Sequence, residues 1–560
     1  MAGFGNSVVG SFVAQFWLPI TVSVILGWLV KNRYHNGLNK YPGPFLASLT
    51  DAWRLWDVYG QRPELTHQKL HAKHGDVVRL GPNTLSFADP KALKSIYGLN
   101  KGFVKSDFYV VQQSVVKGHS LASLFSTTDN NFHAQFRRCV NSAFAMSALV
   151  QYEPFVDNTT KLFLKQTEKL FAGNPSGCDF TQWLQFYAFD VIGEITYSKR
   201  HGFVEKNEDI DGIVSYLGNL FLYVAPIGQI PWLDLVFLKN PIYLKLSQWG
   251  FIDSTFPVAR FARQRMAERL GPNLSGDPSK PLLPVSTEGK AEVKSPDLLS
   301  KFLAAQDARP DFMSDVLVQT MAVSMAFAGS ETTAISLASV FYYLLRNPAA
   351  LAALRRELDG AAASGLFSDR ETGLVTWAES QKLPYLDACI KESFRLHPAA
   401  GLPLERIVPE PGAEIAGHHV KGGTVVGCSA WIIHRRPEIW GDDVDAFRPE
   451  RWLVGADLEG EEKEEQERRV REMNGMMFQF GMGSRTCIGK NISLLEIYKV
   501  VPSLLRRFDI RFKDPSQEWK LVNAWFVKQQ NFQAMFEVRD LVKPAGSEEK
   551  ETSEEKKLLS

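Results

Sequence analysis

A single cysteine stands in a short glycine-rich loop at residues 480–489, which read Phe-Gly-Met-Gly-Ser-Arg-Thr-Cys-Ile-Gly. Gly481, Gly483 and Gly489 lack a Cβ, so they allow the backbone to turn sharply and to approach a flat ligand closely. A helical pattern follows the loop, and amides at a helix N-terminus favour the thiolate form of a cysteine over the thiol. Because a thiolate is a metal ligand, we interpret Cys487 as a ligand of iron.

Two other interpretations of Cys487 follow from its residue type alone. A lone cysteine is most often a small, buried and unreactive side chain. A zinc site is disfavoured, because no second Cys or His lies near Cys487 at the spacing of zinc ligands. The choice therefore depends on whether the rest of the chain supplies residues for iron chemistry.

A long apolar helix is expected from Pro310 to Asn347, with Pro310 in its first turn and Pro348 ending it. Residues 321–327 are apolar on nearly all faces of this helix, which predicts that it runs through the centre of the protein. Helices that are apolar all round are stable only when they are buried. Any polar group along this helix therefore needs a specific reason.

Residues 328–333, Ala-Gly-Ser-Glu-Thr-Thr, interrupt the apolar pattern of this helix. Glu331 would be costly to bury without hydrogen bonds. Gly329 costs a helix about 1 kcal/mol relative to alanine. These costs indicate a function, although Thr332 and Thr333 can also bond back to carbonyls of their own helix.

Two pairs of side chains are predicted to share a helix face. His133 and Arg137 are four residues apart, and Glu392 and Arg395 are three apart. By spacing alone, the first pair fits a solvated amphipathic helix. The second fits an exposed ion pair, which would contribute no more than about 1 kcal/mol.

The spacing Phe-x-x-Gly-x-Arg-x-Cys-x-Gly in residues 480–489 resembles the haem-binding signature of cytochrome P450 enzymes, with every fixed position filled. The resemblance implies haem b, with Cys487 as the axial ligand of the haem iron and the opposite face of the iron left open. It further implies that Phe480 shields the sulfur, that Arg485 reaches a haem propionate and that Gly489 lies close to the haem. A thiolate ligand favours cleavage of an O–O bond on the iron.

The same resemblance assigns roles to the other residues. Contacts to haem propionates are implied for His133, Arg137 and Arg406. Glu392 and Arg395 are implied to form a buried structural network with Arg451, since a planar guanidinium can serve two partners. In residues 328–333, Ala328 and Gly329 would leave room for O2. Thr332 would hydrogen-bond the dioxygen, and Glu331 would relay protons. Residues 399–403 would line the substrate cavity, and residues 203–256 would form a lid over it.

The N-terminal segment predicts a membrane anchor. Residues 8–30 contain no charged residue, and as a helix they would span roughly 34 Å, enough to cross a bilayer. Lys31, Arg33 and Lys40 follow, which places the rest of the chain on the cytosolic side. A cleaved signal peptide is the alternative, but the apolar run is long and no basic residue precedes it. We expect residues 1–35 to be a single-pass anchor, and the resemblance to microsomal members implies the endoplasmic reticulum membrane.

Composition is that of an ordinary globular protein, with 45% hydrophobic and 22% charged residues. The net charge of +1 gives no attraction to nucleic acid. Five cysteines without paired spacing fit a reduced, cytosol-facing domain. We expect one catalytic domain over residues 36–540, and the resemblance implies the mainly α cytochrome P450 fold with small β-sheets.

Several local structures are predicted as well. Residues 75–87 read as a β-hairpin around a Gly-Pro-Asn turn. Residues 271–295 read as a flexible linker. Residues 455–474 read as a solvated charged segment, and residues 541–560 as a disordered charged tail.

The function implied is that of a membrane-anchored monooxygenase, which inserts one oxygen atom from O2 into a small lipophilic substrate by hydroxylation, demethylation or epoxidation. Electrons would come from NADPH through NADPH–cytochrome P450 reductase, with cytochrome b5 as an optional second donor. Residues 401–406 and 485–491 further resemble filamentous-fungal members such as pisatin demethylase, which implies secondary-metabolite biosynthesis or detoxification.

Two alternatives stay open. The first is a related haem-thiolate enzyme that carries out a multi-step oxidation or rearrangement, although a rearranging enzyme would not need both Glu331 and Thr332. The second, of another class, is a non-catalytic haem sensor or electron carrier. Such a protein would not need a deep apolar channel.

Overall fold

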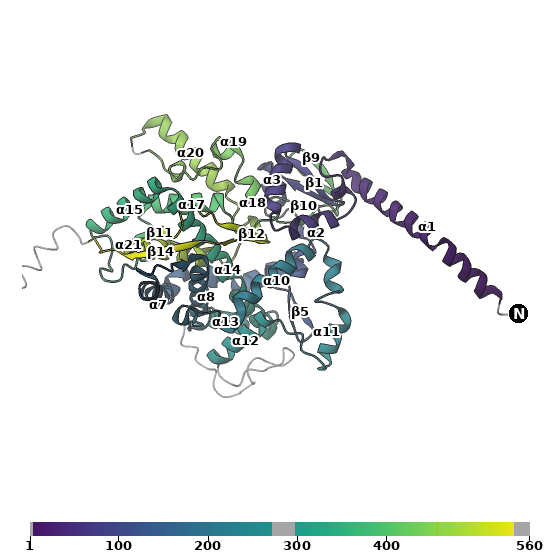
Figure 1. Cartoon of the computed structure of the whole chain (residues 1–560), viewed down its shortest axis with the longest axis horizontal. Helices are drawn as coiled ribbons and strands as arrows, with labels where there is room; N and C mark the ends of the chain where they lie inside the picture. The colour runs from purple at the N-terminus through teal and green to yellow at the C-terminus, as the bar shows by residue number, and fades with distance from the viewer. Residues whose placement is uncertain (1–3, 271–296, 456, 543–560) are drawn as a thin grey trace, which may run out of the picture.

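A long central helix, α14 (Asp315–Arg346), organises the computed structural model, which describes residues 4–270, 297–455 and 457–542 (Figure 1). The helix begins at Asp315 rather than at Pro310, because Ser314 takes the extended backbone of an N-cap residue (φ −76°, ψ 166°). The helix continues through residues 328–333, so the predicted interruption is one of polarity and not of backbone. Most of α14 is buried, as predicted.

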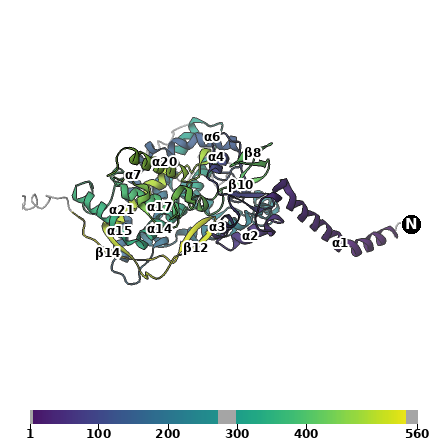
Figure 2. The same cartoon turned by 90° about the horizontal axis from the view of Figure 1, so that it is seen from above.

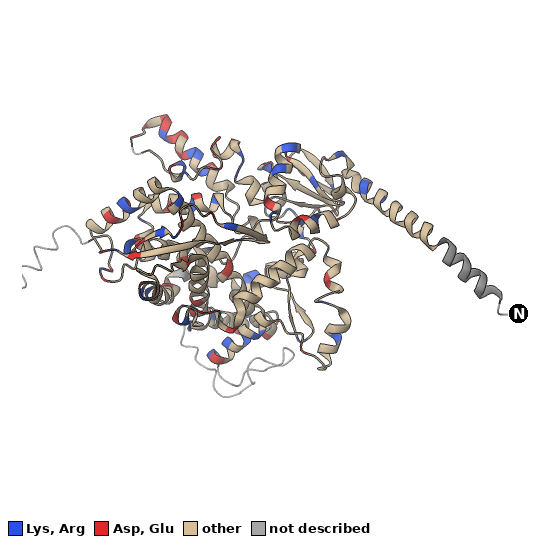
Figure 3. Ribbon diagram, viewed as in Figure 1, with Lys and Arg blue, Asp and Glu red and all other residues tan. Residues whose placement is uncertain are grey.

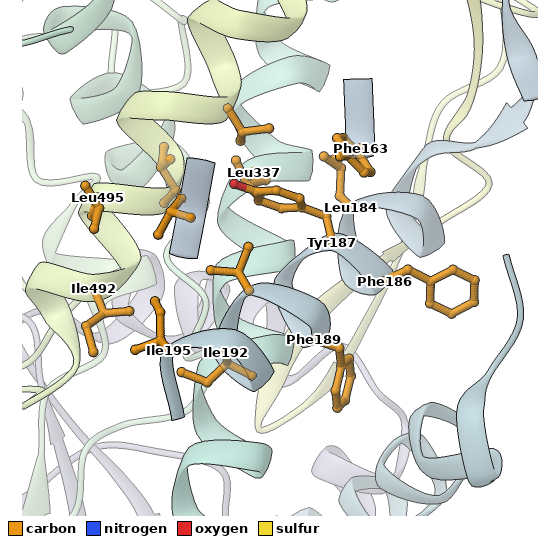
Figure 4. Close-up of a cluster of buried hydrophobic side chains, with 14 of the residues drawn as sticks. Phe163, Leu184, Phe186, Tyr187, Phe189, Ile192, Ile195, Leu337, Ile492 and Leu495 are labelled. Carbon is orange, nitrogen blue, oxygen red and sulfur yellow. The ribbon is translucent and has the colours of Figure 1, made fainter. Parts of the chain in front are cut away.

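The core lies where α14 meets three other long helices, which are α7 (Met146–Phe171), α8 (Phe180–Tyr197) and α21 (Lys490–Arg507). Nearly every residue of α8 is buried, as expected for a helix that is apolar on all sides. Figure 4 shows Tyr187 of α8 between Phe163, Leu337 and Leu495, side chains that come from the other three helices. These four helices therefore form the rigid frame behind the candidate site.

The remaining helices surround this frame. They are α2 (Ala52–Tyr59), α3 (Pro63–His74), α4 (Lys91–Tyr97), α5 (Phe108–Val111), α6 (Asn130–Val140), α9 (Phe203–Lys206), α10 (Ile213–Ile227), α11 (Pro241–Gln248), α12 (Pro257–Leu270), α13 (Leu298–Ala308), α15 (Pro348–Ala363), α16 (Trp377–Ser380), α17 (Pro384–Leu396), α18 (Ala430–Ile433), α19 (Pro437–Trp440) and α20 (Gly460–Met476). Single turns of 3-10 helix connect several of them, including η4 (Ile210–Gly212), η5 (Pro231–Leu235) and η7 (Gly483–Arg485).

The strands form small sheets at the periphery. The largest has the order β1 (Val77–Gly81), β2 (Thr84–Phe87), β10 (Val425–Gly427), β7 (Arg406–Ile407) and β3 (Val104–Lys105). A second sheet has the order β11 (Phe508–Phe512), β14 (Gln533–Val538) and β6 (Cys178–Asp179). Pairs are formed by β12 (Lys520–Ala524) with β13 (Phe526–Gln530), β4 (Ser114–Val116) with β5 (His119–Leu121), and β8 (Gly412–Ile415) with β9 (His418–Lys421). The mainly α class and the hairpin at residues 75–87 are thus confirmed, with β1 antiparallel to β2.

The N-terminal helix, α1 (Phe4–Tyr34), projects from the body in both views (Figures 1 and 2). Large apolar side chains between Trp17 and Val30 are exposed. Its base is fixed, since the Arg79 guanidinium donates to the carbonyls of Asn32 (2.7 Å) and Arg33 (2.8 Å). Within the described residues, residues 210–227 meet the length and hydropathy criteria of a membrane-crossing helix, but 44% of that window is buried in the protein. The anchor expected at residues 1–35 stays a prediction.

Charged residues lie mainly on the outer helices (Figure 3). The predicted charged segment at residues 455–474 contains most of α20, whose side chains are largely exposed and form pairs such as Glu467 with Arg471, 3.4 Å apart. The predicted linker at residues 271–295 lies outside the described residues. So does the predicted tail, apart from residues 541 and 542.

Candidate functional site

The loop that carries Cys487 joins α20 to α21. Its backbone closes on itself, since the Cys487 amide donates to the Phe480 carbonyl at 2.8 Å. Gly481 and Gly483 have φ of +69° and +67°, which are left-handed values that favour glycine. A Cβ on Gly483 would also lie 1.9 Å from the carbonyl oxygen of Tyr97. Gly489 differs, because its φ is −81° and a Cβ there would meet no atom of another segment within 4 Å among the described residues.

The thiol of Cys487 faces an internal cavity at the N-terminus of α21. Burial raises its pKa, while hydrogen bonds from the Gly489 and Lys490 amides and the charges of Arg137 and Lys490 act in the opposite direction. The Gly489 and Lys490 amides therefore act in the direction that the sequence predicts, and the thiolate form of Cys487 with bound iron stays a prediction. The amides still point at the sulfur, where they would stabilise a thiolate bound to a metal cation.

The cavity has a volume of about 290 Å³ and a mostly apolar wall. Segments distant in sequence form it: residues 105–144, the middle of α14, the segment after α17, the cysteine loop with the start of α21, and the tip of the β12–β13 hairpin, together with Ile192 of α8. Its lining includes Leu121, Leu124, Phe125, Phe144, Ile192, Met321, Phe327, Ala328, Gly329, Thr332, Phe394, Ala399, Ala400, Leu402, Phe480, Cys487, Trp525 and Phe526. Three of the residues predicted at 399–403 are among them. The predicted lid at 203–256 reaches this wall through Phe221, whose ring packs on Phe327 and Phe526.

Cationic side chains gather at one part of this cavity. Arg137 donates to the Thr486 carbonyl (2.7 Å), and Arg485 donates to the Thr127 carbonyl (3.1 Å) and to Asn130 Oδ1 (2.8 Å). Arg406 donates to its neighbour's carbonyl, at residue 405 (2.8 Å). Burial lowers the pKa of Arg137, and burial together with the charge of Arg406 lowers the pKa of Arg485 to about 10.

The neutral His133 and a fourth cationic side chain, Lys105, lie at the same part of the cavity, and Lys105 completes the cation cluster. His133 is buried, and its pKa is lowered to about 3 by burial and by the neighbouring cations, so the imidazole is neutral. Lys105, which the motif analysis did not identify, is also buried, with Nζ 4.0 Å and 4.1 Å from the ring centres of Tyr109 and Phe125. Burial, followed by repulsion from Arg406 and Arg485, lowers the Lys105 pKa well below its usual value.

The cation cluster requires an anionic partner. In the described part of the chain, Lys105, Arg137, Arg406 and Arg485 form no ion pair with a carboxylate. Buried charges without a partner are costly. A ligand with an apolar body and negative groups at one edge would relieve this cost, and haem with its two propionates has that chemistry. The site residues therefore fit a haem, with Cys487 for the iron.

Small and hydroxyl-bearing residues of α14 face the cavity near Cys487. Ala328, Gly329 and Thr332 are all in its lining. The Thr332 hydroxyl donates to the Ala328 carbonyl at 2.8 Å, so the back-bond expected for a helical threonine is present. Gly329 has a second reason to be glycine, because a Cβ there would lie 3.0 Å from Ile192 Cγ1 of α8. Its size thus permits the close packing of α8 on α14 as well as space in the cavity.

Glu331 is buried but does not line the cavity. Its carboxylate accepts from Gln185 of α8 and lies 3.1 Å from Lys528 Nζ of β13. These partners supply the hydrogen bonds that a buried carboxylate needs. The structure therefore brings Thr332 to the cavity and holds Glu331, its neighbour in sequence, behind the wall.

The structure joins Glu392, Arg395 and Arg451 in one fully buried network. Arg395 donates to both oxygens of Glu392 (2.8 and 2.9 Å), and Arg451 Nε donates to Oε1 (2.8 Å). Trp452 Nε1 donates to the other oxygen (2.9 Å), so the carboxylate is saturated. Arg395 also bonds the carbonyl of His434 (3.0 Å). These hydrogen bonds join α17 to residues 451 and 452, which precede the cysteine loop in the sequence.

Comparison with known proteins gives matches over nearly the whole chain. A family model described as Cytochrome P450 matches residues 42–536. The cytochrome P450 monooxygenase cicH of Emericella nidulans is 40% identical over 503 residues, covering 90% of this chain and 94% of that protein. A cytochrome P450 monooxygenase of Aspergillus terreus is 39% identical, over 88% and 94% of the two chains. The cytochrome P450 monooxygenase mpaDE of Penicillium brevicompactum is 36% identical over 94% of this chain and 58% of that protein.

These matches confirm the resemblance first drawn from residues 480–489. They also confirm that the protein is an oxidoreductase that incorporates oxygen. Membership implies a haem cofactor, O2 and electrons from a redox-partner reductase. This chain belongs to the cytochrome P450 family.

Proposed function

We propose that this protein is a membrane-anchored haem-thiolate monooxygenase that inserts one oxygen atom from O2 into a small lipophilic organic molecule. The reaction would be a hydroxylation, a demethylation or an epoxidation. The observation that carries the proposal is the single cavity that combines Cys487, the cation cluster and Thr332 within a mostly apolar wall. A multi-step oxidation of one substrate would use the same residues.

The residues around the cavity would bind a haem through both its iron and its propionates. Cys487 would bind the iron, and Phe480 would shield its sulfur. The propionates would be held by the cations Lys105, Arg137, Arg406 and Arg485, with the neutral imidazole of His133 beside them. When bound, the haem supplies activation of O2 with electrons delivered from outside.

We assign to Thr332 the role of holding a proton at its hydroxyl in the cavity, because it lies beside Ala328 and Gly329 in the cavity lining. Its hydroxyl proton is engaged by the Ala328 carbonyl, which leaves oxygen lone pairs free on the cavity side. Ala328 and Gly329 keep the adjoining space open. Glu331 directly precedes Thr332 in the sequence. It would resupply protons once its carboxylate breaks its contacts with Gln185 and Lys528.

The apolar wall selects the substrate and excludes water. Phe125, Phe327, Leu402, Trp525 and Phe526 present carbon atoms to the cavity. Desolvation of an apolar substrate against such a surface is favourable, by roughly 25 cal/mol for each Å² buried. A lipophilic molecule therefore fits this cavity better than a charged one.

We also infer that the protein is attached to the endoplasmic reticulum membrane, with the catalytic part in the cytosol. Besides α1, large apolar side chains are exposed from η5 through α11 to Phe251, and we call them the apolar patch: Trp232, Leu235, Val236, Phe237, Leu238, Ile242, Tyr243, Trp249 and Phe251. Figure 1 shows α11 on the same side of the body as the base of α1. So many exposed apolar side chains in one short segment support contact with a membrane or another apolar surface, and the apolar helix α1 favours the membrane.

We infer further that the protein acts in fungal secondary-metabolite biosynthesis or detoxification, since the relatives named above are monooxygenases from fungi. Electrons would come from NADPH through NADPH–cytochrome P450 reductase, with cytochrome b5 as an optional second donor.

The function is tested with full-length protein, NADPH–cytochrome P450 reductase and a panel of lipophilic fungal metabolites under 18O2. We expect a product that is heavier by one 18O atom for at least one metabolite, or loss of a methyl group as formaldehyde. NADPH consumption without any oxygenated or demethylated product would contradict the proposed substrate class.

A further inference from the structure

Glu331 is held in a closed set of contacts behind the cavity wall. Lys528 Nζ lies 3.1 Å from Glu331 Oε1 and donates to Gln185 Oε1 at 3.0 Å. The Gln185 amide nitrogen in turn donates to Glu331 Oε2. Glu331 and Gln185 are buried, while the Lys528 side chain is 28% exposed. We call Glu331, Gln185 and Lys528 the triangle, and Lys528 is its member that reaches solvent.

The hairpin that carries Lys528 has its tip in the cavity. Ala524 pairs with Phe526, so Trp525 alone makes the turn between β12 and β13. Trp525 has a φ of +77°, a left-handed value that is strained for a bulky residue. Such strain is concentrated at functional sites. Trp525 and Phe526 both line the cavity, so an occupant of the cavity would press on the strained turn.

Lys528 lies three residues after Trp525, on the strand that leaves this turn. Alternate residues of a strand share a face, so Phe526 and Lys528 lie on the same side of β13. Phe526 packs on Phe221 (4.9 Å between ring centres), and Phe221 packs on Phe327 (5.1 Å). Phe327 is one helical turn before Glu331 on α14. The hairpin is therefore linked to the same stretch of α14 twice, indirectly through Phe221 of α10 at the cavity and directly through the Lys528–Glu331 contact.

We propose that Lys528 is a positioning residue that couples filling of the cavity to release of Glu331. In the closed triangle, Lys528 and Gln185 hold the carboxylate away from the space that Thr332 faces. A substrate that displaces Trp525 and Phe526 shifts β13 and loosens the Lys528 contact. The carboxylate is then free to accept a proton from water and to turn toward Thr332. This inference rests on the proposed function, because it requires Glu331 to supply protons to the cavity.

The test measures the affinity of haem-loaded, full-length protein for 4-phenylimidazole, a probe whose imidazole nitrogen binds iron and whose phenyl ring would enter the apolar cavity beside it. A ligand that must open the triangle binds more tightly when the triangle is already broken. Lys528→Met is therefore expected to lower the Kd by about 5-fold or more. Glu331→Gln should have a similar effect, and the double variant should show no further change, because both substitutions break the same contact.

Two variants separate positioning from a general structural role. Lys528→Arg keeps the positive charge and should retain the wild-type Kd. Lys520→Met removes an exposed lysine from β12 of the same hairpin and should leave the Kd unchanged. Unchanged or weaker binding in Lys528→Met, or independent addition of the two effects, would overturn the coupling. If either result occurs in a protein with a normal haem-thiolate spectrum, the coupling is wrong and the proposed function is unaffected. If the wild-type protein lacks a haem-thiolate spectrum, the proposed function itself is wrong.

Discussion

At the scale of single residues, the Glu392 network shows what one buried charge requires. Arg451→Leu would remove one donor from a fully buried carboxylate, and breaking a buried ion pair in this way costs about 3–5 kcal/mol. We expect a loss of that size in the free energy of unfolding, measured by chemical denaturation.

Arg448, in the same motif, provides a matched control. Its side chain is 46% exposed and lies 3.2 Å from Asp443. Arg448→Leu should cost less than about 1 kcal/mol, as exposed pairs do. Equal losses from the two substitutions would show that the network is not buried as described.

His434 predicts a pH dependence of stability. Its Nε2 accepts from the Phe478 amide (2.8 Å) and its Nδ1 lies 3.1 Å from the Arg395 carbonyl, so the ring is neutral. Burial, followed by the charge of Arg395, lowers the His434 pKa to about 3, against about 6.5 in the unfolded chain. The unfolded chain therefore binds a proton that the folded chain lacks as pH falls below 6.5, and stability falls with it by up to ~1.4 kcal/mol per pH unit.

Replacement of this histidine tests the effect directly. His434→Gln should flatten the dependence of the unfolding free energy on pH between 5 and 6.5 by up to ~1.4 kcal/mol per unit. His419→Gln, at an exposed histidine, should leave the slope unchanged. A wild-type slope in His434→Gln would contradict the neutral, buried assignment.

Residue motifs allowed much of the site to be predicted, but not all of it. Cys487, Arg485 and Phe480 lie within ten residues, so their spacing alone identified them. Lys105 and Lys528 lie in short strands without a motif and join the site only through the fold. The amides of Gly489 and Lys490 at the start of α21 do act on the Cys487 thiol in the predicted direction, because the loop and the helix are adjacent in sequence.

At the scale of elements, the packing of α8 on α14 depends on Gly329. In Gly329→Ala, the new Cβ would lie 3.0 Å from Ile192 Cγ1. Overpacking of about 1–3 kcal/mol should outweigh the gain of about 1 kcal/mol from replacing a helical glycine. We expect a net loss of stability, measured by thermal or chemical denaturation.

Two controls isolate this contact. A Cβ on Gly360 of α15 would meet no atom of a neighbouring segment within 4 Å, so Gly360→Ala should stabilise the protein by up to about 1 kcal/mol. In an Ile192→Ala background, Gly329→Ala should lose most of its cost, because the crowding atoms are gone. Stabilisation by Gly329→Ala as large as that by Gly360→Ala would refute close packing at this point.

Element positions followed from sequence where local signals were strong. The hairpin at residues 75–87 was predicted from its turn residues and is present as β1 and β2. The start of α14 was misplaced because Pro310 is a suitable first-turn residue, yet Ser314 takes the N-cap conformation. The helix α20 was not anticipated, since a run of charges without an apolar stripe gives no periodic signal.

At the scale of the whole molecule, we expect two parts of the chain to attach it to the membrane: the helix α1 and the apolar patch. The full chain should sediment with membranes and resist a high-salt wash, because an apolar helix is not released by screening charges. A chain that starts at residue 31 keeps the Asn32 and Arg33 carbonyls that hold Arg79. It should still bind vesicles weakly through the apolar patch.

Substitution in the apolar patch completes this test. Trp249→Ser with Phe251→Ser, in the shortened chain, should release it from vesicles, since burial of each such side chain contributes about 1.5–3 kcal/mol. The matched change Trp56→Ser, at an exposed aromatic in α2 outside the patch, should have a smaller effect. Full release of the wild-type chain by salt would contradict the proposed anchor.

The proposed monooxygenase function depends most directly on the bond between Cys487 and the haem iron. The decisive measurement is the absorption spectrum of the reduced, haem-loaded protein with and without carbon monoxide. A strongly red-shifted Soret band is expected in the wild-type protein, and its loss is expected in Cys487→Ala, while Cys428→Ala, at a buried cysteine outside the cavity lining, should retain it. A wild-type protein without that band, or a Cys487→Ala variant that keeps it, would contradict the assignment of Cys487 as the iron ligand.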